Sequence, residues 1–140
     1  MNDITSYMLE QTKKILSIDS PTGFTAHAAE YVLGAYKKLG YDAKLTNKGG
    51  IFVCVNDGPD QADDPADAPI LLEAHMDTLG GMVCSINEKG RLMLSALGGM
   101  NPNNAEAENC RVYTRSGKVY SGTFQLKNAS IHVNGSYNDT

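Results

Sequence analysis

The residues best suited to chemistry are a histidine and an aspartate two positions apart, in Glu73-Ala74-His75-Met76-Asp77. Residues i and i+2 of an extended chain lie on the same face, so the His75 imidazole and the Asp77 carboxylate are expected to be neighbours. A neutral imidazole is a common metal ligand, and a carboxylate on its other nitrogen fixes the tautomer and raises its basicity. The pattern predicts that His75 binds a transition metal and that Asp77 orients it.

The sequence does not complete such a site. A catalytic zinc needs about three protein ligands and an open position for water. We expect His27 in the first turn of a helix, in a solvated or capping role, and His132 in a late strand, in a structural or partner-facing role. Glu106 and Glu108 fall in a polar loop. The residues therefore indicate one ligand, and a purely structural, hydrogen-bonded His75 stays open as the alternative.

Other chemistries find no support in the sequence, which has no GxSxG elbow, no P-loop and no GxGxxG motif. Its three cysteines, Cys54, Cys84 and Cys110, stand far apart and form no CxxC pair. An odd number of cysteines is typical of a reduced cytoplasmic protein. Cys54 and Cys84 lie in apolar runs, which predicts buried, inert thiols.

Composition limits the classes of partner. The chain has 140 residues, is 41% hydrophobic and 20% charged, and carries a formal net charge of -4. These values are typical of a soluble globular protein, and the acidic balance argues against nucleic-acid binding. No apolar run approaches the roughly 18–20 residues of a membrane span, and the first residues lack the features of a signal peptide. We therefore expect a cytoplasmic protein without a membrane or nucleic-acid partner.

The first half of the sequence has the pattern of helices packed on a sheet. Apolar residues recur at helical spacing over 4–18 and again from about 25 to 39, with the breaker Ser20-Pro21-Thr22-Gly23 between them and Gly40 after them. Strands are predicted at 42–46, at 51–55 in the interior and at 69–74, where a buried strand leads into the His75 segment. An exposed loop is predicted at 57–69.

The second half has an all-β pattern. Short strands are predicted at 81–86, 91–97, 110–114, 118–124 and 129–133, with turns at 88–90 and 116–117 and a further turn within 104–109. Such a segment is expected to form a small antiparallel sheet or barrel. The residue pattern changes from helices and strands to strands alone near residues 77–80. Each half is small for an independent domain.

Several motifs together resemble one known family. Ser20-Pro21-Thr22-Gly23, Asn47-Lys48-Gly49-Gly50 and the stretch from Leu71 to Gly80 are similar to the N-terminal portion of family 42 of the metallopeptidases. This family comprises glutamyl, deblocking and tetrahedral aminopeptidases, some also called endoglucanase M. The similarity continues through Leu97-Gly98-Gly99 and Tyr120-Ser121-Gly122-Thr123, so it covers essentially the whole chain.

The resemblance implies an α/β fold. Residues 1–79 would be the N-terminal part of a zinc-peptidase-like (phosphorylase/hydrolase-like) catalytic domain, and residues 80–140 a segment of an inserted, β-barrel dimerisation domain. His75 matches the first metal ligand of the family, and Asp77 matches the catalytic-site acid that orients it. The other ligands and the general base of the family lie after the barrel, and members are roughly two and a half times this length.

The resemblance also implies a function. The full-length enzyme would be an aminopeptidase that holds two divalent metal ions, zinc or cobalt, binds a peptide substrate and forms a homo-oligomer. This chain is expected to be a fragment with little activity alone. Two alternatives stay open, namely a non-catalytic oligomerisation or binding module and a fragment of a family 20 metallopeptidase. The β-rich sequence directly after Gly80 argues against family 20.

Overall fold

The computed structural model describes residues 3–55, 70–127, 129, 130 and 132. The chain divides into two compact units, Met1–Leu79 and Gly80–Thr140. The division falls where the residue pattern of the sequence changes, while the roles assigned to the two segments stay predictions.

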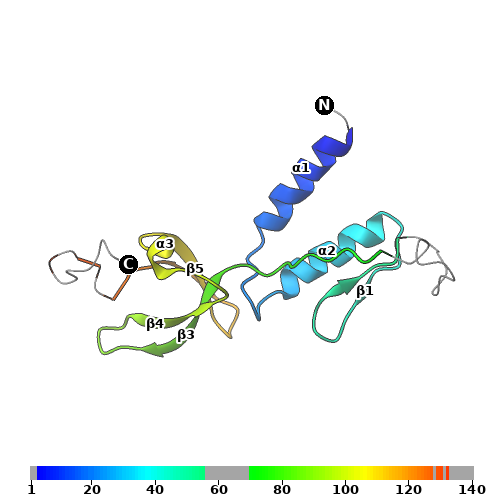
Figure 1. Cartoon of the computed structure of the whole chain (residues 1–140). Coiled ribbons are helices and arrows are strands. Elements are labelled where there is room, and N and C mark those ends of the chain that lie inside the picture. The colour runs from blue at the N-terminus through cyan, green and yellow to red at the C-terminus, as the bar shows by residue number, and fades with distance from the viewer. Residues whose placement is uncertain (1–2, 56–69, 128, 131, 133–140) are drawn as a thin grey trace. The chain divides into compact units, whose positions relative to one another are not determined.

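Two helices dominate the first unit, as the helical spacing predicted (Figure 1). Helix α1 spans Asp3–Leu16, with an acidic residue in its first turn and Lys13 and Lys14 in its last, an order that suits the helix dipole. Helix α2 spans Ala26–Lys38. It stops before Gly40, whose positive φ of 91° is a conformation that glycine adopts without strain.

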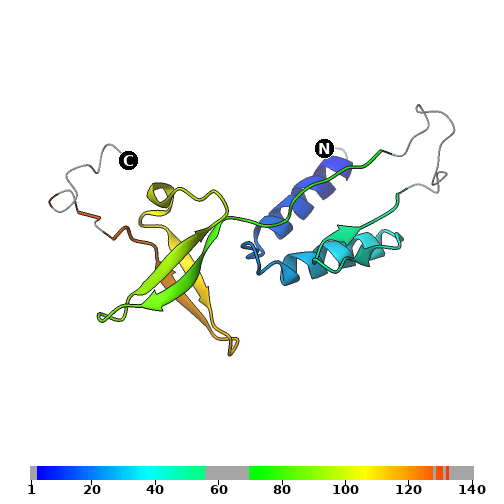
Figure 2. The ribbon, with the colours of Figure 1, turned by 60° about the horizontal axis from the view of Figure 1, so that its bottom comes forward.

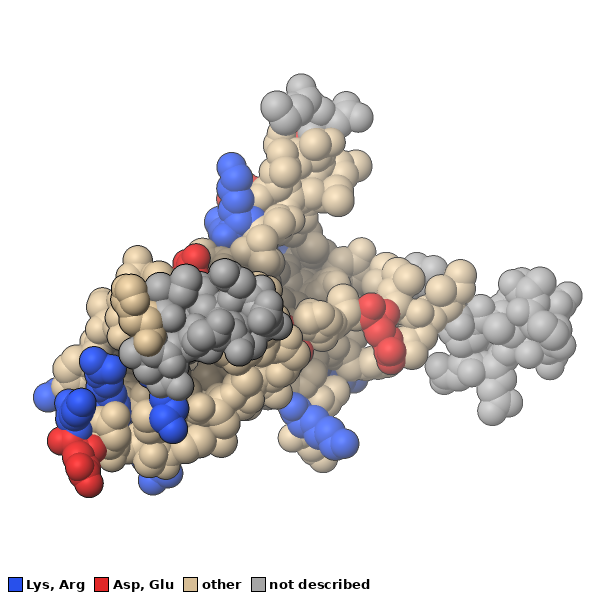
Figure 3. All heavy atoms as spheres, turned by 60° about the vertical axis from the view of Figure 1, so that its left-hand side comes forward, with Lys and Arg blue, Asp and Glu red and all other residues tan. Residues whose placement is uncertain are grey.

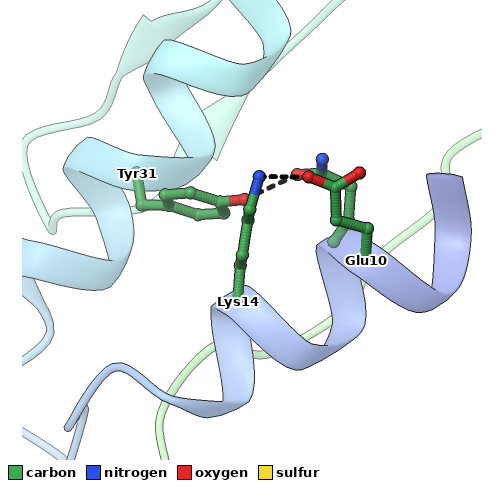
Figure 4. A network of polar contacts seen from close by, with 4 residues as sticks. Glu10, Lys14 and Tyr31 are labelled. Carbon is green, nitrogen blue, oxygen red and sulfur yellow. Dashed lines mark hydrogen bonds and ion pairs between the residues drawn. The ribbon is translucent and has the colours of Figure 1, made fainter.

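A hydrogen bond joins the two helices, and an ion pair within α1 lies beside it (Figure 4). The Tyr31 hydroxyl on α2 donates to Gln11 Oε1 on α1 at 2.6 Å, and Lys14 pairs with Glu10 one turn away on α1. Between the helices lies a groove of about 350 Å³. It is lined by Tyr7, Gln11, Thr12, Ile15, Tyr31, Val32, Ala35, Tyr36 and Leu39.

A short hairpin follows α2. Strand β1 (Lys44–Leu45) pairs antiparallel with β2 (Ile51–Phe52), and Gly49 has the positive φ that the turn requires. The two strands are shorter than the predicted ones at 42–46 and 51–55. The prediction of an interior strand at 51–55 is wrong, because Phe52 and Val55 are more than half exposed.

The predicted buried strand at 69–74 is also wrong for the described residues 70–74. They form no strand, and Ile70 and Leu72 are 88% and 89% exposed. An apolar run becomes an interior strand only when neighbouring strands pair with it and helices cover it. Among the described residues, the nearest bridge lies after this segment, the parallel pair between Pro21 and Thr78. The predicted loop at 57–69 lies outside the described residues.

The core of the first unit is small. Its buried residues are Ala28 and Ala29 on α2, Ala43 before β1, and Ser20 in the connection between the helices. Small side chains allow α2 and the hairpin to approach each other closely. No residue of α1 is buried, although its apolar residues recur at helical spacing.

The second unit consists of two hairpins joined by a short helix (Figure 2). Strands β3 (Gly80–Ile86) and β4 (Leu92–Leu97) pair antiparallel, with a bulge between Val83 and Ser85. Helix α3 (Pro102–Ala105) is capped by the Asn101 side chain. Strands β5 (Asn109–Tyr113) and β6 (Val119–Thr123) form the second antiparallel pair. The four strands and both turns agree with the prediction.

Other expectations for the second unit are not met. The described residues of the predicted strand at 129–133 form no strand, and His132 lies in a turn. The described strands of the whole chain make three separate two-stranded sheets, so a closed barrel is not seen in this part of the molecule. A small α/β protein with short sheets is the fold that the structure shows.

The surface is more apolar than the composition suggested. Cys54 and Cys84 are exposed, so the prediction of buried thiols is wrong; the runs that carry them have too few neighbours in the described structure to cover them. Uncharged residues cover most of the face in Figure 3, and Lys and Arg lie there in small groups with acidic residues beside some of them. No helix of the described chain is long and apolar enough to cross a membrane.

Candidate metal centre

His75 and Asp77 lie side by side, as their spacing predicted. The Nδ1 atom of His75 is 2.9 Å from the Asp77 carbonyl oxygen and 3.2 Å from Asp77 Oδ1. Both partners are acceptors, so Nδ1 is the nitrogen that carries the proton in this arrangement. The lone pair of Nε2 is then free to coordinate a metal ion.

Thr22 is the third member of the cluster. It lies in the connection between α1 and α2, and its hydroxyl donates to Asp77 Oδ2 at 2.7 Å. The Phe24 amide donates to the Pro21 carbonyl at 2.7 Å and closes a four-residue turn with Thr22 and Gly23 at its centre. Gly23 has a φ of 86°, as the third position of a type II turn requires.

A backbone contact joins this turn to the His75 segment. The Thr78 amide donates to the Ser20 carbonyl at 2.7 Å, next to the parallel bridge between Pro21 and Thr78. Ser20 is 1% exposed, so the connection is anchored in the small core of the unit. Two segments more than fifty residues apart in sequence thereby meet at the candidate site.

The surroundings favour an ionised Asp77. The hydrogen bond from Thr22 lowers the pKa of the Asp77 carboxyl below its ordinary value, and this is the largest influence on it. Desolvation acts in the opposite direction, while the backbone amide of Asp77 and the nearby His75 lower the pKa further. A charged carboxylate accepts hydrogen bonds strongly and is the form that orients a metal-binding imidazole.

The donor set fits one metal ligand and its orienting acid. The His75 side chain is 85% exposed and that of Asp77 is 40% exposed, so an ion in solution can reach the imidazole. Within residues 3–55, 70–127, 129, 130 and 132, no three or more His, Cys, Asp or Glu residues are grouped as a metal site would require. Among the described residues, His75 and Asp77 alone do not make up a complete metal site.

The remaining histidines have other surroundings. His27 lies in the first turn of α2, as predicted, and its ring packs edge-on against Phe24 with centroids 5.7 Å apart. The backbone amide of His132 donates to the Ser130 hydroxyl within a turn. A structural role accounts for the observed contacts of both residues.

Sequence reasoning missed the contact of Thr22 with Asp77. The signal was present, because Ser20-Pro21-Thr22-Gly23 and the His75 segment both contribute to the family resemblance. Spacing rules within one helix or strand do not connect positions 55 residues apart, so the pairing needed the structure.

The chain was also compared with known proteins. The model of the M42 glutamyl aminopeptidase family matches residues 50–140, a segment that includes both His75 and Asp77. The chain belongs to the M42 family. The expected relationship to family 42 of the metallopeptidases is thereby confirmed, in preference to family 20.

Two relatives to which the chain is similar are named as aminopeptidases. The "Putative aminopeptidase YhfE" of Bacillus subtilis (strain 168) is 36% identical over 125 residues, which cover 89% of this chain and 34% of the relative. The "Glutamyl aminopeptidase" of Lactococcus lactis subsp. cremoris (strain MG1363) is 32% identical over 112 residues, which cover 79% of this chain and 30% of the relative. The M42 chain thus spans about a third of the length of these relatives.

Proposed function

We propose that this chain contributes the first metal ligand, His75, and its orienting acid, Asp77, to a metal-dependent aminopeptidase that removes residues from the N-terminus of peptides. The contact between His75 Nδ1 and Asp77 carries the proposal, because it leaves Nε2 in the form that binds metal. Membership of the M42 family and the names of both relatives support the same activity.

The roles of the two residues follow from their chemistry. His75 would bind the ion through Nε2. Asp77 accepts a hydrogen bond from Nδ1–H through its carbonyl oxygen, with its carboxylate nearby, which holds the ring in one tautomer and increases its donor strength. Two divalent ions, zinc or cobalt, would polarise the scissile carbonyl and make water a stronger nucleophile when bound. A catalytic zinc takes about three protein ligands. Since the described residues would supply one, we expect little or no turnover by this chain alone.

The setting of the enzyme is part of the proposal. We place the peptide substrate and a homo-oligomeric assembly among its partners and the protein in the cytoplasm. Residues 1–79 would belong to the catalytic domain, and residues 80–140 to a barrel-type dimerisation domain. The two antiparallel hairpins of the second unit are suitable building blocks for such a barrel.

Zinc titration tests the metal role of His75. The 140-residue chain is titrated with zinc chloride by calorimetry, alongside His75→Ala and the control His132→Ala, which removes an exposed histidine from a turn. We expect weak binding by the parent chain and by the control, and its loss in His75→Ala. Equal binding by all three proteins would rule out His75 as the ligand.

Hydrolysis of aminoacyl nitroanilides with added zinc or cobalt tests the activity. We expect no turnover above background by the purified chain. Turnover that survives purification and disappears in His75→Ala would contradict the expected inactivity, while confirming that His75 serves catalysis.

A non-catalytic oligomerisation module remains the second candidate. The specific observation in its favour is the exposure of apolar side chains on the hairpins of the second unit, among them Met82, Val119 and Tyr120. Exposed apolar surface promotes association. The two candidates are compatible in one protein, and a dilution experiment described in the Discussion tests the second.

A further inference from the structure

We propose that Thr22 is a positioning residue for the metal ligand: its hydroxyl holds the Asp77 carboxylate in the orientation in which it fixes the tautomer of His75. This inference rests on the proposed function only in that His75 is taken as the ligand. The Thr22 hydroxyl donates to Asp77, so Thr22 would act on His75 through Asp77.

The two carboxylate oxygens of Asp77 have separate partners. Oδ2 accepts a hydrogen bond from the Thr22 hydroxyl at 2.7 Å, and Oδ1 lies 3.2 Å from Nδ1 of His75. The Asp77 carbonyl oxygen, 2.9 Å from the same Nδ1, is a second acceptor that Thr22 does not contact. The terminal torsion of an aspartate side chain has a broad energy minimum, so an exposed carboxylate can turn freely. The hydrogen bond from Thr22 to Oδ2 restricts this rotation and keeps Oδ1 directed at the imidazole.

Thr22 is itself held in place. It occupies the turn closed by Phe24 and Pro21, where Gly23 supplies the required positive φ. Threonine is β-branched, which restricts rotation of its side chain about χ1. The hydroxyl is therefore presented from a rigid part of the backbone.

The backbone link between the segments does not depend on the hydroxyl. The Thr78 amide donates to the Ser20 carbonyl, and neither group belongs to Thr22. Loss of the hydroxyl should leave the backbone contact between the two segments intact. Only the Asp77 carboxylate should then become free to rotate. This separates a positioning role from a purely structural one.

The test compares Thr22→Val, which keeps the branched shape without the hydroxyl, with Thr22→Ser, which keeps the hydroxyl. Thr25→Val is the matched control, since Thr25 makes no side-chain cap to α2. The first readout is the tautomer of His75 in the metal-free chain, measured by 15N NMR of the imidazole. The second is the dissociation constant for zinc chloride, measured by competition with a chelating dye.

We expect a dominant Nδ1–H tautomer in the parent chain, in Thr22→Ser and in Thr25→Val. In Thr22→Val the Asp77 carbonyl oxygen remains as an acceptor for Nδ1–H, so we expect a partial gain of the Nε2–H form. We expect zinc affinity to fall about tenfold, the lower end of the loss seen when an outer partner of a metal-binding histidine is removed. Circular dichroism checks that the helices are intact, and Thr22→Ala replaces the valine variant if that protein does not fold.

Each outcome decides one question. A folded Thr22→Val or Thr22→Ala chain with an unchanged tautomer would overturn the inference, and so would a Thr22→Ser chain that behaves like the valine variant. If the tautomer shifts as expected but zinc does not bind through His75, the positioning role of Thr22 stands and the proposed metal function fails.

Discussion

The Asp77 carboxylate joins two segments of the chain, with Thr22 on one oxygen and His75 on the other. Replacing Asp77 by Asn keeps the size of the side chain and removes its charge. We expect zinc affinity to fall about 10- to 100-fold, because the neutral amide no longer stabilises the metal-binding form of the imidazole. Dye competition measures the change. Asp42→Asn, at an exposed ion pair with Lys44, should leave the affinity unaltered.

The lowered pKa of Asp77 also predicts a response to acid. The unperturbed value is 3.8 and the pKa in the folded chain is lower, so folding favours the ionised form. The resulting stabilisation is complete above the unfolded value and is lost as the pH falls through the folded one. The free energy of unfolding, measured by denaturant melts at a series of pH values below about 5, should therefore fall less steeply with pH for Asp77→Asn than for the parent chain.

Salt should weaken that acid dependence, because exposed charges are screened. Glu10 also makes the free energy of unfolding fall in acid, since its hydrogen bond with Lys14 lowers the pKa of the Glu10 carboxyl. The comparison is therefore made between Asp77→Asn and the parent chain and not between two pH values of one protein. Identical slopes in the two proteins would contradict the assigned role of Asp77.

Ser20 gives a prediction about stability. Its hydroxyl is buried and has no hydrogen-bond partner among the described residues. A buried, unsatisfied polar group costs about 1–3 kcal/mol. We expect Ser20→Ala to leave stability unchanged or raise it by up to about 1 kcal/mol. Ser17→Ala, which removes a hydrogen bond to the Lys14 carbonyl, is the contrasting control and should not stabilise. Chemical denaturation measures both.

The proximity of His75 and Asp77 could be predicted from sequence because it depends on neighbouring positions of one extended segment. The contact with Thr22 could not, because it depends on how a turn between two helices meets that segment. The lack of a buried environment around His75 also escaped prediction, since burial depends on which other elements cover the strand.

At the scale of elements, the turn between α1 and α2 offers the sharpest test. Gly23 has a φ of 86°, where a side chain is strained even though the space beside it is open. We expect Gly23→Ala to destabilise the first unit by about 1–2 kcal/mol and to weaken zinc binding, because the turn carries Thr22. Urea melts and zinc titration measure the two effects.

Gly34 provides the control for that substitution. It lies within α2, and a Cβ there would meet nothing within 4 Å. Alanine is favoured over glycine inside a helix by about 1 kcal/mol, so Gly34→Ala should stabilise the chain. A Gly23→Ala protein as stable as the parent, with unchanged zinc affinity, would show that the turn does not position the site.

Elements defined by local signals were predicted well. Both long helices and the hairpins of the second unit have turn or cap residues that mark their ends, such as Gly40, Gly90 and Gly117 with positive φ. The segment 70–74 was predicted from its apolar composition alone. Composition does not create the neighbouring strands that such a strand needs, and in the described structure the isolated bridge lies further along the chain, at Thr78.

At the scale of the whole molecule, the exposure of apolar side chains is the dominant feature. Ile70, Leu71 and Leu72 are at least 70% exposed, and the hairpins of the second unit expose further large side chains. Exposed apolar surface of this kind promotes association. We expect the chain to form dimers or larger species that dissociate on dilution, as sedimentation velocity over a hundredfold range would show.

Single substitutions identify the surface responsible. Tyr120→Lys places a charge on β6, and Ile4→Lys places one on α1; both parent side chains are exposed. If the second unit carries the oligomer contacts, Tyr120→Lys should shift the distribution toward monomer and Ile4→Lys should not. A strictly monomeric parent chain would count against an oligomerisation module.

The hydrogen bond between Thr22 and Asp77 spans 55 positions of the chain. Closing so long a loop costs entropy that a contact within one helix or hairpin does not require. Helices and hairpins form in microseconds, and contacts at large sequence separation slow folding. The metal-binding geometry is therefore expected to appear late in folding, after α1, α2 and the hairpins, and a chain still being synthesised would hold no oriented His75 until its first eighty or so residues had emerged and folded.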